Sequence, residues 1–272
     1  MGGERSMGLT GAILGDIAGS RFEFEKCISA WDSCELFHKD CVFTDDTVQS
    51  LAIGMAAITD NDYASHLNHL CNRYLFVGYG GNFHKWLDSS QKVSNNSWGN
   101  GSAMRVSVIG EVASSIEDAE KYAELSAKCT HNSAEGIRGA KTIAGCVYLA
   151  KNGYSKRDIM EYAQAMYPLD RCEYYIGREL KEYKSTYKFE VNCEKSVPVA
   201  IQCFLESISF ETCLRNVLYI NGDTDTLGAM AGAIADSFYP ETGFDNAQIL
   251  KKYLDVELYD IWERIERHIN YG

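Results

Sequence analysis

Proline is scarce in this 272-residue sequence, and long hydrophobic runs are missing. The chain has only three prolines, and because proline removes a helix-forming N–H, this scarcity favours long uninterrupted helices. No apolar run approaches the roughly 18 residues that a membrane-spanning helix requires, so we expect no membrane partner. The N-terminal segment also lacks the pattern of an export signal, which predicts a cytoplasmic location.

Basic residues are few relative to acidic ones. The chain has 26 Lys and Arg against 38 Asp and Glu, a formal net charge of -12. This balance gives no general attraction for nucleic acid, and we expect no nucleic-acid partner. No two of the ten cysteines have CxxC spacing, which argues against a zinc ribbon or redox motif and favours free thiols. The length suits one large domain or two small ones, and the 46% hydrophobic content is enough for a sizeable core. We expect a single domain over residues 1–272.

Helical patterns recur along the chain. Six segments are predicted to be helical, namely 48–59, 114–131, 133–153, 155–167, 226–240 and 255–270. Ser115 and Ser155 each precede an aspartate by three residues, the spacing of a capping box, and Gly153 suits a left-handed helix end. A weak strand pattern is confined to 187–192, inside a segment, 171–195, that we interpret as a loop or small excursion. The whole pattern predicts an all-α fold.

Several predicted helices carry rows of small residues, including 52–57, 139–145 and 228–233. Glycine costs about 1 kcal/mol of helix propensity relative to alanine, so close packing of the backbones must offset that cost. We therefore expect these helices to be central, and their ends are natural places for a site.

Two of these small-residue helices begin with the same kind of acidic sequence, although they lie far apart in the chain. The two motifs are Thr44-Asp45-Asp46-Thr47 and Asp223-Thr224-Asp225-Thr226. Either motif alone is equally consistent with ordinary helix caps. Capping needs one such residue per helix, whereas each start has two carboxylates and two hydroxyls. Oxygen ligands of this kind suit Mg²⁺ or Mn²⁺, and a two-metal site if all four carboxylates converge.

Two glycine-rich segments, 78–81 and 97–101, have the composition of ligand loops. Glycine allows backbone amides to approach a phosphate, and Tyr79 or Trp98 could stack on a base. Ordinary turns would explain either segment alone. His131 lies between two predicted helices and could be a cap, while Glu23 lies between two phenylalanines and would have a raised pKa if buried.

The ordered set of motifs resembles the ADP-ribosylglycohydrolase family, which includes the glycohydrolase that reactivates dinitrogenase reductase. The motifs are GDxxGxxxEF, TDDT, GYGG, SWGNGSAMR, THN and GDTDT, in this order over most of the chain. The resemblance implies a compact orthogonal all-α domain with two divalent cations, Mg²⁺ or Mn²⁺. It also implies cleavage of the glycosidic bond between ADP-ribose and an acceptor on a protein or small molecule, which releases ADP-ribose.

The resemblance also implies roles for residues at matching positions. The cation ligands would be Thr44, Asp45, Asp46, Asp223, Asp225 and Thr226. The substrate-binding residues would be Gly78, Gly80, Gly81, Ser97, Trp98, Gly99, Asn100, Gly101 and His131. We expect Asp46 to be the carboxylate nearest the chemistry, with Asp45 and Glu23 as further catalytic candidates and Glu23 as a gate or proton carrier. Asp16 would support the loop before Glu23.

Several alternatives remain at this point. Arginine is the favoured acceptor, by likeness to the dinitrogenase-reductase type; serine and small ADP-ribose derivatives are the alternatives. A relative that binds ADP-ribose without catalysis should have lost metal carboxylates, and all four are present. A terpene synthase would need DDxxD or DDxxE, which the sequence after Asp46 does not supply. A two-metal phosphoesterase would release AMP instead of ADP-ribose.

Overall fold

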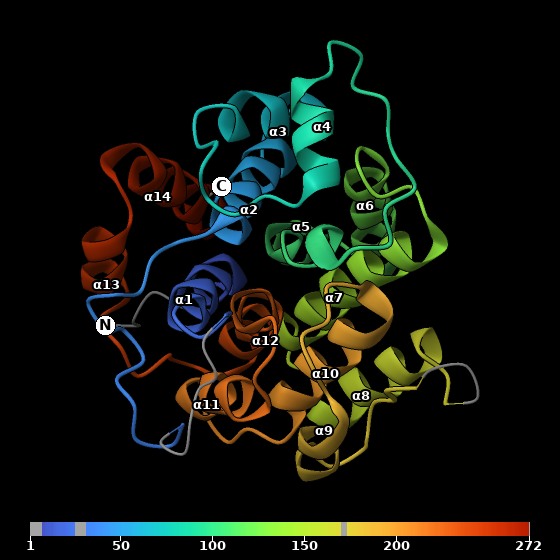
Figure 1. Cartoon of the computed structure of the whole chain (residues 1–272), viewed down its shortest axis with the longest axis vertical. Coiled ribbons are helices and arrows are strands. Elements are labelled where there is room, and N and C mark those ends of the chain that lie inside the picture. The colour runs from blue at the N-terminus through green and yellow to red at the C-terminus, as the bar shows by residue number, and fades with distance from the viewer. Residues whose placement is uncertain (1–6, 25–30, 170–172, 272) are drawn as a thin grey trace.

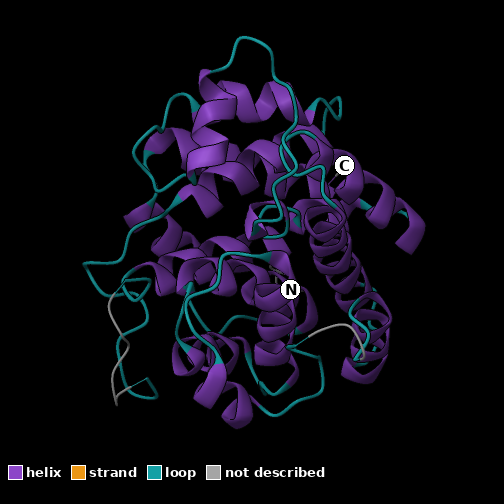
Figure 2. Cartoon of the chain, turned by 45° about the vertical axis from the view of Figure 1, so that its right-hand side comes forward, coloured by secondary structure: helices purple, strands orange, loops and turns teal. Residues whose placement is uncertain are grey.

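The computed structural model describes residues 7–24, 31–169 and 173–271. Within these ranges the fold is built from α-helices without a strand, as Figure 2 shows, and only two isolated β-bridges occur. This confirms the predicted all-α fold. No helix in the described part of the chain is long and apolar enough to cross a membrane. The cysteines of that part are all free thiols, while Cys27 and Cys172 lie outside it.

The described residues form fourteen α-helices and one short 3₁₀ helix. They are α1 Gly8–Ser20, α2 Asp45–Ala57, α3 Tyr63–Cys71, α4 Gly81–Asp88, η1 Asn100–Ser102, α5 Ser107–Val112, α6 Ile116–Lys128, α7 Ala134–Lys151, α8 Lys156–Met166, α9 Leu180–Thr186, α10 Cys193–Leu205, α11 Phe210–Ile220, α12 Thr224–Phe238, α13 Asn246–Tyr253 and α14 Val256–Tyr271.

Local sequence signals set several of these boundaries. The Ser115 side chain accepts a hydrogen bond from the Asp118 amide at the start of α6. At the start of α8, Ser155 and Asp158 form a complete capping box. Helix α7 ends before Gly153, whose φ of 78° is the predicted left-handed conformation. The predicted ends of these helices are therefore confirmed.

Helices α1 and α12 lie side by side at the centre of the molecule, with other helices around them (Figure 1). Their glycines face each other so closely that a Cβ on Gly15 would lie 2.0 Å from the Gly228 carbonyl oxygen. A Cβ on Gly11 would lie 2.3 Å from the Gly232 oxygen. The row on α12 was expected from sequence, whereas its partner row on α1 was not. Because the backbones are in contact, the position of α12 relative to α1 is closely constrained.

The weak strand pattern at 187–192 does not correspond to a strand in the structure. This segment follows α9 as irregular chain, and only Asn192 forms an isolated bridge, with Gly99. The alternation of large residues has another cause: Tyr187 is buried in the core, whereas Phe189 and Val191 are 46% and 45% exposed. Since no strand runs beside this segment among the described residues, its backbone bonds are few, and they join it to the chain around Trp98.

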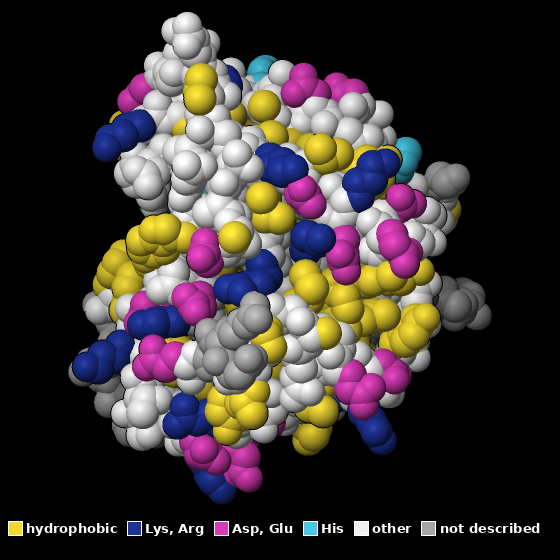
Figure 3. Space-filling view, turned by 90° about the vertical axis from the view of Figure 1, so that its right-hand side faces the viewer, with side chains coloured by type: hydrophobic (Ala, Val, Ile, Leu, Met, Phe, Trp, Pro, Cys, Tyr) yellow, Lys and Arg dark blue, Asp and Glu magenta, His cyan; other side chains and the backbone are white. Residues whose placement is uncertain are grey.

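Charges of both signs are interspersed over the face of the molecule in Figure 3, among scattered hydrophobic side chains. Although the chain has a net charge of -12, the acidic side chains on that face do not form one continuous patch. The concentration of acidic groups that matters chemically lies inside the molecule, at the starts of α2 and α12.

Candidate active site

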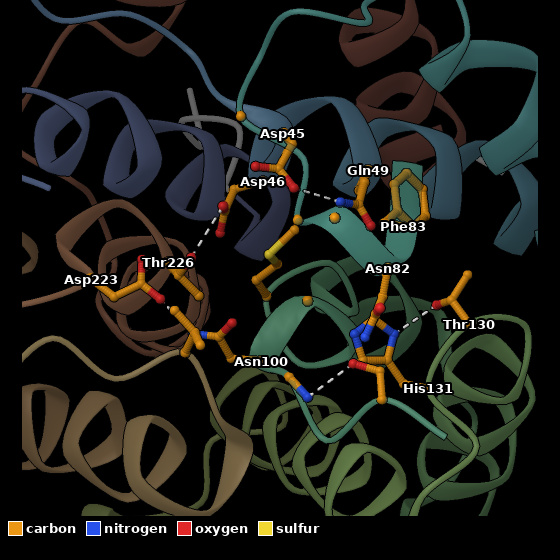
Figure 4. A pocket seen from close by; sticks show the side chains of 18 of the residues that line it. Asp45, Asp46, Gln49, Asn82, Phe83, Asn100, Thr130, His131, Asp223 and Thr226 are labelled. Carbon is orange, nitrogen blue, oxygen red and sulfur yellow. Dashed lines mark hydrogen bonds between the residues drawn. The ribbon is translucent and has the colours of Figure 1, made fainter. Parts of the chain in front are cut away.

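A pocket of about 500 Å³ opens where the starts of α2 and α12 meet three loops. All the site residues expected from sequence line it, except Thr44, which lies directly behind Asp46. In Figure 4 the carboxylates lie on one side of the pocket, and His131 and Thr130 lie on the other. We call these sides the acidic end and the histidine end.

The acidic end joins residues that are distant in sequence. The Thr226 hydroxyl donates to Asp46 Oδ2 over 3.2 Å, across 180 positions of the chain. Asn100 Nδ2 donates to Asp223 Oδ2 over 2.6 Å, which orients that carboxylate from the loop 97–101. One helical turn after Asp45, Gln49 donates its amide N–H to the Asp45 carboxylate over 2.7 Å (Figure 4). Asp45, Asp46 and Asp223 therefore each have a neighbour that fixes the orientation of the carboxylate.

Asp16 of α1 holds the start of α2 in place. Its carboxylate accepts hydrogen bonds from the amide and hydroxyl of Thr44 and from the amide and hydroxyl of Thr47. The expectation that Asp16 supports the loop before Glu23 is therefore wrong. Asp16 is fully buried and points at the orphan N–H groups of α2, for which a carboxylate is the stronger acceptor.

The acidic end has the donor set of a divalent cation site. Asp16, Asp46 and Asp225 bring one oxygen each within 4.8 Å of one another, and so do Glu23, Asp223 and Asp225. Asp46 Oδ1 and Asp225 Oδ1 are buried and have no hydrogen-bond partner among the described residues. Unpartnered buried carboxylate oxygens are costly unless a cation completes them. The residues therefore fit hard divalent cations.

Burial and mutual repulsion strain this cluster in the absence of a cation. Burial raises the pKa of Asp45 to about 8, with further repulsion from Asp16 and Asp223. Burial and the Asp223 charge raise the pKa of Glu23 to about 7. Burial also raises the pKa of Asp46 and Asp225 well above their usual range. The ionised form of these carboxylates is thus destabilised unless a cation binds among them.

We expect the stability of the metal-free protein to fall as the pH rises from about 4 towards 8. In this window the folded carboxyl groups, with their raised pKa values, hold more protons than the unfolded ones, so raising the pH favours unfolding. Saturating Mg²⁺ should remove this pH dependence of the stability, because the cation stabilises the ionised carboxylates. Thermal unfolding between about pH 5 and 8, in EDTA and in Mg²⁺, measures both. A metal-free stability that increases with pH would contradict this prediction.

Between the acidic end and the histidine end, glycines leave room for a ligand. Gly78 has a φ of 106°, and a Cβ on Gly80 or Gly81 would meet nothing within 4 Å. The segment leads into the N-terminus of α4, where backbone N–H groups are available to an anion. Gly101 lies against His131, because a Cβ there would be 3.3 Å from the imidazole. Burial lowers the pKa of His131 to about 3, so its ring is neutral.

The two aromatic candidates for base stacking have different positions. Trp98 lines the pocket and is 55% exposed, as a stacking platform requires. Tyr79 is only 5% exposed, packs against Phe83 and donates its hydroxyl to the Cys71 carbonyl oxygen. The suggestion that Tyr79 stacks on a base is therefore wrong, because its ring is part of the core.

Sequence reasoning missed a further set of lining residues: Gln49, Asn82, Phe83, Asn95, Asn96, Met104, Thr130, Phe189 and Val191. One helical turn separates Gln49 from Asp45, and that spacing could have revealed it. Phe189 and Val191 reach the pocket only because Asn100 and Cys193 bond their segment to the loop 97–101. No local pattern signals that contact.

The family model described as ADP-ribosylglycohydrolase matches residues 6–266. The chain belongs to the ADP-ribosylglycohydrolase family. ADP-ribosylhydrolase ARH3 from Mus musculus is 30% identical, over 90% of this chain and 89% of the relative. ARH3 from Homo sapiens is also 30% identical, over 90% and 91%. A solved ADP-ribosylglycohydrolase-related protein complex has the same fold, with a TM-score of 0.75, 18% identity and 98% coverage of both chains.

Family membership confirms the resemblance seen in the motifs and gives the enzyme class. The chain is an ADP-ribosyl glycohydrolase, a hydrolase that acts on glycosidic bonds. The family is metal-dependent, and it acts on ADP-ribosylated substrates and releases ADP-ribose. The clustered carboxylates at the acidic end agree with the metal dependence.

Proposed function

We propose that two divalent cations, Mg²⁺ or Mn²⁺, bind at the acidic end and that ADP-ribose lies along the pocket from there to the histidine end. The observation that carries the proposal is the meeting of two acidic helix starts, 180 positions apart, at one end of a glycine-lined pocket. The proposed cation ligands are Thr44, Asp45, Asp46, Asp223, Asp225 and Thr226. The single-domain organisation and the cytoplasmic location stay predictions.

The pocket accommodates ADP-ribose in one direction. The ribose whose glycosidic bond breaks lies at the acidic end, and the diphosphate lies against the backbone of 78–81 and 97–101. The adenine stacks on Trp98, and the neutral His131 contacts the sugar beside it. This direction places the apolar rim residues Phe189 and Val191 along the side of the ligand. It also leaves the acceptor pointing out of the mouth next to Glu23.

Hydrolysis proceeds through an oxocarbenium-like transition state, in which positive charge develops at the anomeric carbon. When bound, divalent cations supply positive charge that orients oxygen ligands and lowers the pKa of water. Asp46 takes the proton of the attacking water, whose oxygen forms the new bond to the anomeric carbon. Glu23 is half-buried and lines the pocket, so its carboxyl group can carry a proton to the departing acceptor.

We propose serine ahead of arginine as the acceptor. Arginine was favoured by likeness to the dinitrogenase-reductase type, whereas the similar curated relatives are named ADP-ribosylhydrolase ARH3. An arginine acceptor also places a guanidinium at the mouth. Among the described lining residues, Glu23 is the one carboxylate that is not a proposed cation ligand, and it would have to pair with that group as well as carry the proton to it. A neutral hydroxyl-linked acceptor needs no such partner.

Product analysis tests the proposal. The purified protein is incubated with Mg²⁺ and either an ADP-ribosyl-serine peptide or ADP-ribosyl-arginine, and products are identified by mass spectrometry. We expect EDTA-sensitive release of free ADP-ribose, faster from the serine peptide. Release from arginine alone would reverse the acceptor proposal. AMP as the product would instead indicate phosphoanhydride cleavage and contradict the glycosidic reaction at this site.

Trp98→Ala should weaken ADP-ribose binding by about tenfold, because a base stacked on an aromatic ring contributes about 1–3 kcal/mol. Calorimetry with ADP-ribose measures the loss. Ribose 5-phosphate is the matched ligand, since it has no base, and its affinity should be the same in Trp98→Ala and in the unsubstituted protein. Unchanged ADP-ribose affinity in Trp98→Ala would place the adenine elsewhere.

A further inference from the structure

A fully buried arginine lies beneath the pocket, between its two ends. Arg105 has no exposed surface, and its guanidinium donates to Gln49, Ser126 and Thr130, none of which is a carboxylate. Burial lowers its pKa to about 10, so the guanidinium remains positive at neutral pH. Burying an unpaired charge is costly. Replacement by an apolar residue would avoid that cost, which points to a role for its hydrogen bonds.

On one side, Arg105 reaches the acidic end. Its Nη1 donates to Gln49 Oε1 over 2.7 Å, and Gln49 Nε2 donates to Asp45 Oδ2 over 2.7 Å. The orientation of the amide is determined, because a guanidinium only donates and a carboxylate only accepts. Figure 4 shows Gln49 beside Asp45 at the upper edge of the site. Arg105 thus orients the side-chain amide of Gln49, and this amide in turn orients Asp45, a proposed cation ligand.

On the other side, Arg105 reaches the histidine end. Its Nη2 donates to Thr130 Oγ1 over 2.9 Å and to the Ser126 carbonyl oxygen over 3.0 Å. Thr130 Oγ1 lies 2.7 Å from His131 Nδ1. Thr130 Oγ1 accepts from the guanidinium, and we assign its own hydrogen to a bond with Nδ1. The neutral ring then carries its proton on Nε2, the nitrogen that faces Gly99 and Gly101 beside the pocket.

We propose that Arg105 is a positioning residue that couples the two ends of the pocket through the chain Asp45–Gln49–Arg105–Thr130–His131. The chain orders a cation ligand at one end and the tautomer of a substrate-binding histidine at the other. When a ligand fixes the side chains at one end, less conformational entropy is lost in fixing those at the other end. Cation binding and ADP-ribose binding therefore strengthen each other. This inference rests on the proposed function, which places the cations and ADP-ribose at those ends.

Thr130→Val tests the coupling from the end remote from the cations. Valine keeps the shape of threonine but removes the hydroxyl that joins Arg105 to His131, and it leaves Gln49 and Asp45 unchanged. Calorimetric titration with Mn²⁺, without nucleotide, should show a dissociation constant raised about fivefold. Thr142→Val is the matched control, because its buried hydroxyl bonds only to the Arg138 carbonyl oxygen of its own helix. An unchanged Mn²⁺ affinity in Thr130→Val would overturn the inference.

A double-mutant cycle separates the loss of this coupling from a loss of Mn²⁺ affinity that any disturbance of the fold would cause. In a Gln49→Leu background the chain is already broken, so adding Thr130→Val should have no further effect on Mn²⁺ affinity. Additive effects would overturn the coupling. If Thr130→Val does not fold, Arg105→Lys replaces it in the cycle, since an ammonium keeps the charge but cannot bridge Gln49 and Thr130 as the guanidinium fork does.

The tautomer of His131 is a second measurement, which would not change if Arg105 and Thr130 only stabilised the fold. Nitrogen-15 NMR should show the proton on Nε2 in the unsubstituted protein and a mixture of tautomers in Thr130→Val. A proton on Nδ1 in the unsubstituted protein would overturn the inference. Failure of the unsubstituted protein to bind Mn²⁺ or ADP-ribose would instead contradict the proposed function, so the two failures are distinguishable.

Discussion

Asp46→Asn should lower the release of ADP-ribose by on the order of 10³-fold, the range expected when a carboxylate that moves a proton in the transition state is lost. The buried Asp46 carboxylate has one oxygen held by Thr226 and one without a partner among the described residues. Asparagine has the same shape, but it cannot take a proton and is a poorer ligand for a cation. Initial rates of ADP-ribose release, measured by mass spectrometry in saturating Mg²⁺, test this prediction.

The fold of Asp46→Asn should remain intact, and its metal-free stability should not fall. Burial and the charges of Asp16 and Asp45 raise the pKa of Asp46, so the ionised group destabilises the protein without a cation. The increase in melting temperature on adding Mg²⁺ should shrink or disappear. Asp60→Asn is the matched control, because Asp60 is exposed and outside the pocket, and its turnover should be unchanged. Turnover of Asp46→Asn equal to that of the unsubstituted protein would remove Asp46 from the mechanism.

Gly15→Ala should decrease the free energy of unfolding by about 3 kcal/mol, at the upper end of what overpacking costs. The added Cβ would lie 2.0 Å from the Gly228 carbonyl oxygen and 2.3 Å from its carbonyl carbon. These are backbone atoms, so α1 and α12 must separate, and no side chain can rotate away to make room. Chemical denaturation with circular dichroism at 222 nm (a standard helix signal) measures the loss.

The same substitution should weaken cation binding, although Gly15 contacts no ligand. Its neighbour Asp16 holds the start of α2, and α12 carries Asp225, so separating the two helices moves the two halves of the acidic end apart. Gly80→Ala is the matched control for stability, since its added Cβ meets nothing within 4 Å and its φ of -62° suits alanine. Equal loss of stability in both variants would show that the contact between α1 and α12 is not the cause.

Patterns within a few residues were enough for the all-α class, for six of the fourteen α-helices of the described residues and for most of the candidate site. The capping serines 115 and 155, the glycine at 153 and the helical periodicity predict helix boundaries because these interactions span a single turn. The paired acidic starts were recognisable because each carries more carboxylates than a cap needs. The weak strand pattern at 187–192 does not mark a strand, since alternation describes side chains and not the partner strand with which they would form a sheet.

The sequence by itself determined the helical class, the family and which oxygen-rich and glycine-rich segments carry the site. Only the tertiary structure decided that Asp16 supports the start of α2, that Tyr79 is a core residue and that Phe189 borders the pocket. It also decided that Arg105 lies between Gln49 and Thr130. The physical reason is range: caps and helical faces depend on neighbours one turn away, whereas these contacts join segments far apart in the chain, brought together by the packing of α1 against α12 and of the loops around them.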